Sequence, residues 1–240
     1  NKKTDRIQQK FYSKIDQLID KAHELDIDGY DCYFALASFK EPTSRKVDNV
    51  HKLQSFFFDI DCGDVKDKEG KGYATQEDAI VALQGFCKTL KLPTPVLVNS
   101  GRGVHVYWHL SEPAIYDDWF PVASRLKALT KTHGLICDHS VTSDAARILR
   151  IPTTHNHKTT PPTKVAYFGN TDQGLVNFDA FSELLGHDSI PVPERMVEEF
   201  SAVVQGLYNN RENYFKDIVA KTSKGEGCAQ IAHVLKNPNE

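Results

Sequence analysis

The stretch L-Q-S-F-F-F-D-I-D, residues 53–61, decides the fold. Its apolar and aromatic side chains are nearly continuous, which is typical of a β-strand buried on both faces. Asp59 and Asp61 are two residues apart on this strand, so their carboxylates point to the same face, about 7 Å apart. Isolated acids on a buried strand are costly, and a divalent cation is the usual compensation. In the alternative interpretation, the two acids lie at a strand end and meet water or a lysine.

Helices and a hairpin are predicted for the segments after this strand. The predicted helices are 75–90 and 116–133, and the predicted hairpin strands are 96–99 and 104–110, joined by the turn 100–103. Thr75 is a suitable N-cap for the first helix, with Asp78 three residues on. The second helix tolerates Pro121 because it falls in the first turns. Strands mixed with central helices in this order predict an α+β sheet domain.

The flanking segments extend this domain and then change in character. Apolar spacing predicts a helix over 10–25, and a charged, glycine-bearing composition predicts a loop at 63–72. Further strands are expected at 31–39, 135–140, 146–151 and 165–168. We predict a catalytic domain at 1–190 and a helical region at 191–240, with helices at 194–207 and 213–221. The second region is expected to lead into a further module.

Composition narrows the class of protein. The 240-residue chain carries a formal net charge of -3, which argues against a basic coat of the histone kind but leaves room for a locally basic groove. Its five cysteines are scattered with no C-x-x-C pair, so we expect reduced thiols and no disulfide framework. No apolar run approaches the roughly 20 residues of a membrane span, and the expected location is the cytoplasm.

A glycine-rich turn and a histidine form the second candidate site element. Gly101 and Gly103 would let backbone amides approach an anion closely, with Ser100 and Arg102 beside them. His105 follows on the outgoing strand, where it could hydrogen-bond a phosphate. The sequence contains no P-loop string. A glycine hairpin with a packed histidine is the plainer alternative.

The third element places acids ahead of clustered cations. Asp138 follows an apolar run, Asp144 is a competing acid, and Arg147, Arg150 and Lys158 come after them. Cations just beyond an acid suit a nucleoside triphosphate with bound metal. Isolated arginines are otherwise most often surface or ion-paired residues.

Taken together, the three elements resemble the signature blocks of the archaeo-eukaryotic primase (AEP, or primase-polymerase) superfamily, and most of all its phage and mobile-element members. The resemblance covers roughly residues 30–180. It implies an RRM-like antiparallel sheet with flanking helices, and catalytic, metal-binding roles for Asp59, Asp61 and Asp138. It also implies nucleotide contacts by Ser100, Arg102, Gly103, His105, Arg147, Arg150 and Lys158. Many relatives have serine where this chain has Gly103.

The resemblance further implies a DNA primase or DNA-directed polymerase, a nucleotidyltransferase working with two Mg²⁺ or Mn²⁺ ions. Its substrates would be nucleoside triphosphates, ribo or deoxy, on a single-stranded DNA template. A fused or associated helicase is an expected partner, and a phage protein would act in the host cytoplasm. A zinc module is not expected, because the cysteines for one are missing. Cys137, His139, His155 and His157 could be combined into a site, but the H-x-H pair is expected to be solvated.

Two other classes remain open from the sequence. Clustered acids with two metals also fit a nuclease, although the arginine-lysine block favours a free triphosphate. A non-catalytic binder of single-stranded nucleic acid would need exposed aromatics on an RRM-like sheet, where this chain has Asp59 and Asp61.

Overall fold

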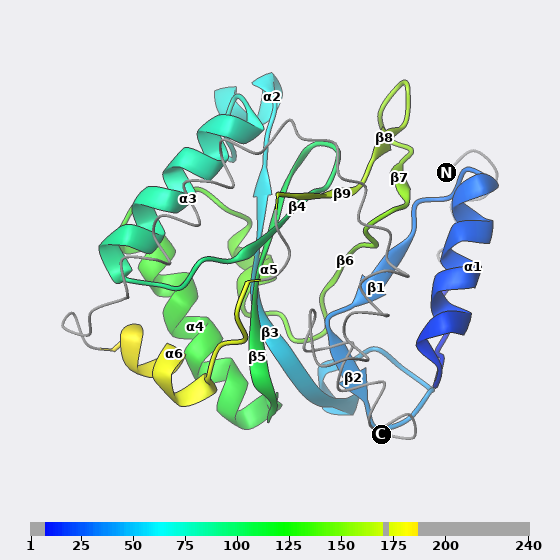
Figure 1. The fold of residues 1–240 in the computed structure, drawn as a ribbon, viewed down its shortest axis with the longest axis horizontal. Helices are drawn as coiled ribbons and strands as arrows, with labels where there is room; N and C mark the ends of the chain where they lie inside the picture. Colours follow the sequence, from blue (N-terminus) through cyan, green and yellow to red (C-terminus); the bar gives the residue numbers. More distant parts are fainter. Residues whose placement is uncertain (1–7, 170–172, 187–240) are drawn as a thin grey trace.

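The structure, a computed structural model, describes residues 8–169 and 173–186, and an antiparallel sheet lies at its centre (Figure 1). The sheet has five strands in the order β2-β3-β5-β4-β9, with every neighbouring pair antiparallel. The strands are β2 (Ala37–Phe39), β3 (Val50–Asp61), β4 (Val96–Asn99), β5 (Gly103–Ile115) and β9 (Ala166–Phe168). The central pair, β3 and β5, is also the longest, with 12 and 13 residues. The predicted α+β fold with an antiparallel sheet is confirmed.

Three helices cover one face of this sheet: α3 (Gln76–Leu90), α4 (Tyr116–Thr132) and α6 (Phe178–Leu184) (Figure 1). Aromatic side chains fill the space between the layers. The Phe56 ring on β3 stacks on Trp119 at 5.8 Å and on Phe181 at 4.8 Å between centroids, and Phe58 meets Trp108 edge-on. Burial of such large side chains is the main favourable contribution to folding, so the helices hold β3 firmly in place.

On the other side of the sheet, a second small layer contains α1 (Ile15–Ile27) and the pair β1 (Tyr33–Ala35) and β6 (Ile148–Arg150) (Figure 1). Ala22, Cys32 and Ile151 form a small buried cluster that joins the helix to this pair. The hairpin of β7 (His155–Asn156) and β8 (Thr163–Lys164) follows β6. The start of the described chain and residues 148–164 therefore meet here.

Most predicted elements are present, with three corrections. The loop predicted at 63–72 contains a short helix, α2 (Asp64–Lys68), after Gly63, whose φ of 114° favours glycine. The strand predicted at 135–140 is wrong: an irregular segment leads into the short helix α5 (His139–Thr142). The strand predicted at 31–39 is divided between β1 and β2, which belong to different sheets. Thr75 caps α3 as expected, since its hydroxyl accepts from the Asp78 amide at 3.1 Å.

Predictions about the region 191–240 lie outside the described residues, as does the domain limit at 190. Among the helices that the structure describes, none is long and apolar enough to cross a membrane.

Candidate active site

The site lies where β3 ends and β5 begins, on the side of the sheet that carries the second layer. Asp59 lies directly opposite His105, and Asp61 opposite Gly103, in the register of the two strands. The pairing sets the Asp59 carboxylate 3.9 Å from Nε2 of His105. The predicted first and second site elements are therefore neighbours across one strand pair.

Asp59 carries an electrostatic penalty at this position. Burial raises its pKa, and the nearby charges of Asp61 and Asp138 raise it further, against the opposing effect of Arg147, to about 7. Its side chain is thus mostly, though not fully, withdrawn from water, with 21% exposed, and lies close to like charges. A positive ion bound beside it would relieve both effects, and carboxylate oxygens are the ligands that Mg²⁺ and Mn²⁺ prefer.

Asp61 has a cationic partner in the structure. Nζ of Lys66, on α2, lies 2.7 Å from the Asp61 carboxylate. Hydrogen bonding to Asp61 is the first cause of the raised pKa of Lys66, which keeps the ammonium charged. The plainer interpretation of the D-x-D pair expected a lysine beside the two acids. Lys66 is that lysine, and among the described residues it pairs with Asp61 and not with Asp59.

Asp138 reaches the site through its backbone. Its amide donates to the Asp59 carbonyl at 2.8 Å, so the two residues are fixed side by side without a strand. Its carboxylate caps α5 and accepts from the amide and hydroxyl of Ser140, at 2.9 and 2.6 Å. Burial opposes ionisation, but these bonds and the charge of Arg147 prevail, and the pKa of Asp138 is lowered.

Asp144 occupies a different position. Its carboxylate accepts from the amide of Ala146 at 3.0 Å and so shapes the turn before β6. Between the two candidates for the third acid, only Asp138 bonds to the backbone of Asp59, and its carboxylate lies 3.6 Å from the Arg147 guanidinium, whereas Asp144 meets Arg147 through the main chain.

No three His, Cys, Asp or Glu side chains in the described ranges come close enough together to enclose one metal ion. Asp61 faces Lys66 and Asp138 faces Ser140, while the backbones of Asp59 and Asp138 are in contact. The donor set nevertheless fits a divalent cation in its chemistry: three carboxylates, one of them with a pKa raised by burial and by the charges of the other two.

Two arginines face this acidic cluster. Arg147 approaches Asp138, and Arg150 pairs with Asp31 at 3.2 Å and lies over the Tyr33 ring at 4.9 Å. Within the part of the chain that the structure describes, Nε of both arginines is buried without a hydrogen-bond partner. A buried donor left unpaired is costly, so both groups are suited to an incoming acceptor such as a phosphate oxygen.

His105 is a neutral histidine. Burial and the charges of Arg150 and Arg147 lower its pKa to about 3. Nδ1 lies 3.3 Å from the Tyr107 hydroxyl, and Nε2 faces Asp59. In the neutral ring one nitrogen donates and the other accepts, so His105 can bind a polar ligand without adding charge.

The glycine turn is held by its own contacts. The Gly101 amide donates to the Asn99 side chain at 2.7 Å, and the Ser100 amide donates to the Gly103 carbonyl at 3.0 Å. These two amides are engaged inside the turn, contrary to the expectation that the Gly101 amide meets an anion. A Cβ on Gly103 would lie 2.2 Å from the Ile60 carbonyl, so this backbone has no room for a serine there.

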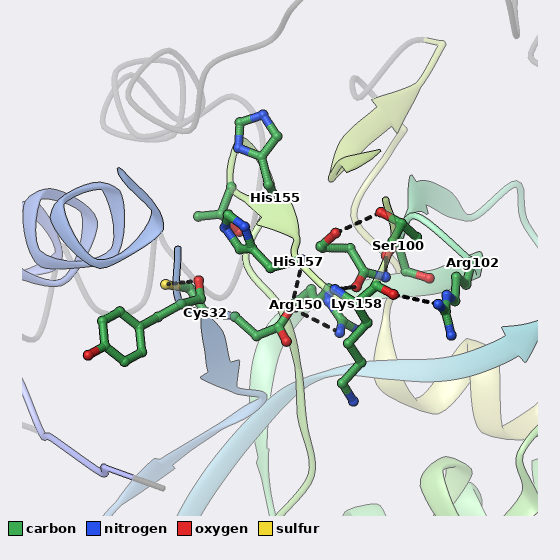
Figure 2. A network of polar contacts seen from close by, with 12 residues as sticks. Cys32, Ser100, Arg102, Arg150, His155, His157 and Lys158 are labelled. Carbon is green, nitrogen blue, oxygen red and sulfur yellow. Dashed lines mark hydrogen bonds and ion pairs between the residues drawn. The ribbon is translucent and has the colours of Figure 1, made fainter. Parts of the chain in front are cut away.

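The segment 155–158 connects the turn to the second layer (Figure 2). The side chain of Asn156 donates to the Ser100 carbonyl at 3.0 Å, and Arg102 donates to the Lys158 carbonyl at 2.5 Å. In Figure 2 the side chain of Lys158 extends away from these contacts. These contacts join the turn to the segment that carries Lys158.

The expectation that His155 and His157 are solvated holds only in part, since the His155 side chain is 40% exposed and that of His157 15%. Both rings hydrogen-bond the buried carboxylate of Asp26, at 2.8 and 2.9 Å. Asp26, Asp31 and Lys66 were missed in the sequence. The only signal was a run of acids after a helical segment, D-I-D-G-Y-D at 26–31, and an acidic run is usually a solvated surface.

Comparisons with known proteins agree with the fold. Neither a protein-family model nor a curated protein sequence matches the chain. One solved structure that it resembles is the AEP domain of the cyanophage S-2L primase-polymerase, with a TM-score of 0.51 and 16% identity. The similarity covers 73% of this chain and 86% of that domain. The chain therefore shares the fold of this AEP domain.

Proposed function

We propose that the chain is a template-directed nucleotidyltransferase that synthesises primers, extends DNA, or does both on single-stranded DNA. One observation supports the proposal: Asp61 and Asp138 lie near enough to raise the pKa of Asp59, and Arg147 and Arg150 beside them each have a buried Nε without a hydrogen-bond partner among the described residues. Acids that can hold metal beside donors that can hold phosphate are what triphosphate chemistry requires.

The three aspartates would hold two Mg²⁺ or Mn²⁺ ions. Bound there, the ions would supply activation of the attacking 3′-oxygen and charge neutralisation at the pyrophosphate leaving group. Asp138 would turn from Ser140 toward this position, and Asp61 from Lys66.

The remaining residues bind and orient the nucleotide. Arg147, Arg150 and Lys158 would neutralise the charge on the triphosphate, and the guanidinium groups can grip it with two parallel bonds. His105 would donate one neutral hydrogen bond. The turn residues Ser100, Arg102 and Gly103 would form the wall of the nucleotide site, since Arg102 already contacts the segment that bears Lys158.

The likeness to the S-2L domain supports this assignment, because the name of that protein is primase-polymerase. A metal-dependent nuclease would use the same acids. A nuclease does not need the buried Nε groups of Arg147 and Arg150. Two such donors side by side suit the dense charge of a triphosphate better than the backbone of a duplex. A non-catalytic binder would have no need of a carboxyl group placed where burial and neighbouring acids raise its pKa, as they do for Asp59.

The test is incorporation of labelled nucleotides on single-stranded DNA, with and without a primer, in Mg²⁺ or Mn²⁺. Primer-free product identifies a primase, and product only with a primer identifies a polymerase. Asp59→Asn, Asp61→Asn and Asp138→Asn should each abolish synthesis, whereas Asp144→Asn, which keeps an oxygen for the Ala146 amide, should lose less. Shortening of the template would support the nuclease, and full activity of all three site variants would refute the metal-site assignment.

A further inference from the structure

Two buried carboxylates flank the connection between α1 and β1. Asp26 lies in the last turn of α1 and Asp31 just before β1, and their side chains are only 9% and 10% exposed. Buried charges need partners, and removing a partner from such a group is strongly destabilising. The partners of both acids come from the segment of the chain that carries the predicted nucleotide-binding cations.

Asp31 holds Arg150. Its Oδ1 accepts from the guanidinium at 3.2 Å and from the His157 amide at 3.1 Å. The guanidinium also lies over the Tyr33 ring. These contacts fix the plane of the guanidinium group, while its Nε keeps no partner in the described residues. Figure 2 shows Arg150 and His157 converging on this position.

Asp26 holds the segment that leads to Lys158. Its carboxylate accepts from the His155 amide at 2.7 Å and contacts the rings of His155 and His157. A carboxylate near the C-terminal end of a helix is disfavoured by the helix dipole, so the residue gains nothing from its own helix. Its hydrogen bonds in the described residues come from a segment about 130 positions away in the sequence.

Together these contacts join the second layer to the hairpin. Residues 155–158 are tied to Asp26 and Asp31 on one side, and to Ser100 and Arg102 on the other. A cation whose backbone and neighbours are fixed in this way loses less conformational freedom when it binds a phosphate.

We infer that Asp26 and Asp31 are positioning residues for the polyphosphate of the incoming nucleotide, Asp31 through Arg150 and Asp26 through the segment that bears Lys158. The inference rests on the proposed function. It assigns to α1, which lies across the sheet from the aromatic core, a role in nucleotide affinity that does not require contact with the nucleotide.

The test is a double-mutant cycle between Asp31→Asn and Arg150→Ala, read as the dissociation constants of Mg²⁺-ATP and Mg²⁺-dATP and as KM and kcat. Asp31→Asn should weaken triphosphate binding about tenfold, since one charged hydrogen bond is lost, and should raise KM more than it lowers kcat. It should leave the affinity for the nucleosides unchanged and add nothing once Arg150 is alanine. Asp26→Asn should act in the same direction and increase hydrogen exchange at the His155 amide, which donates to the Asp26 carboxylate.

Asp28→Asn is the matched control, because this exposed acid lies between the two positions and its loss changes the net charge equally. A wild-type protein that binds no triphosphate would refute the proposed function and this inference with it. Wild-type binding that Asp31→Asn leaves intact, or an equal loss in the Arg150→Ala background, would refute the inference alone. If Asp31→Asn fails to fold, Asp31→Glu keeps the charge, and an unchanged KM in it would count against the inference.

Discussion

Replacing Asp59 by asparagine should stabilise the metal-free protein, and the gain should grow as the pH rises. In the folded state burial and the neighbouring acids raise the pKa of Asp59 from 3.8 to about 7. Below about pH 4 the carboxyl is protonated in the folded and the unfolded chain, so it costs nothing. Above pH 7 it is ionised in both, and the folded chain bears the whole penalty.

The size of the effect follows from the shift. About three pKa units at about 1.4 kcal/mol each amount to about 4 kcal/mol of lost stability above pH 7. At pH 5 part of this loss is already present, so the advantage of Asp59→Asn should widen by about 2 to 3 kcal/mol between pH 5 and pH 8.

Urea unfolding in a chelator at fixed ionic strength, at both pH values, measures this difference. The exposed Asp28→Asn serves as the control, with no widening expected. Added Mn²⁺ at pH 8 should then stabilise the wild type more than Asp59→Asn, because only the wild type has the Asp59 carboxylate to bind the ion. If Asp59→Asn were more stable than the wild type by the same amount at pH 5 and pH 8, the ionised Asp59 carboxylate would not be what destabilises the folded protein.

Three further changes test other parts of the molecule. Lys66→Met should strengthen Mn²⁺ binding severalfold in a titration, because the ion no longer competes with an ammonium for Asp61; unchanged affinity would mean that the pair is incidental. Gly101→Ala should destabilise the fold by about 1 to 3 kcal/mol in urea unfolding, because φ is 91° and the new Cβ would lie 2.7 Å from Cβ of Asn156. Trp119→Ala should cost about 3 to 5 kcal/mol, since its side chain is fully buried, and a loss below 1 kcal/mol would contradict the packing described.

The parts of the fold that the sequence predicts well are those with a local physical signal. The nearly continuous apolar run at 53–61 predicts the strand there, and the N-cap at Thr75 predicts the start of α3. The hairpin follows from its glycines. Each of these is decided by residues close together in the chain, which is why sequence alone suffices.

The errors occur where distant segments decide the outcome. Residues 135–137 have the composition of a strand, but they form no ladder with β3, whose partner strands are β5 along most of its length and β2 at its start. Asp138 nevertheless lies beside Asp59, as the predicted third acid should, through a single backbone bond. The partners of Asp26 and Asp31 come from β6 and the segment after it, so no local pattern could have identified them.

The bond between the Asp138 amide and the Asp59 carbonyl has a practical consequence. It involves main-chain atoms alone, so it survives whatever side chains stand at these two positions. The backbone arrangement of Asp59 and Asp138 thus does not depend on the charges of their side chains. A chain with asparagine at all three acidic positions should still fold to the same shape, and it would no longer repel the phosphates of DNA and nucleotide. Under the proposed function, such a chain would be suited to capturing template and triphosphate together in a crystal before any bond is made.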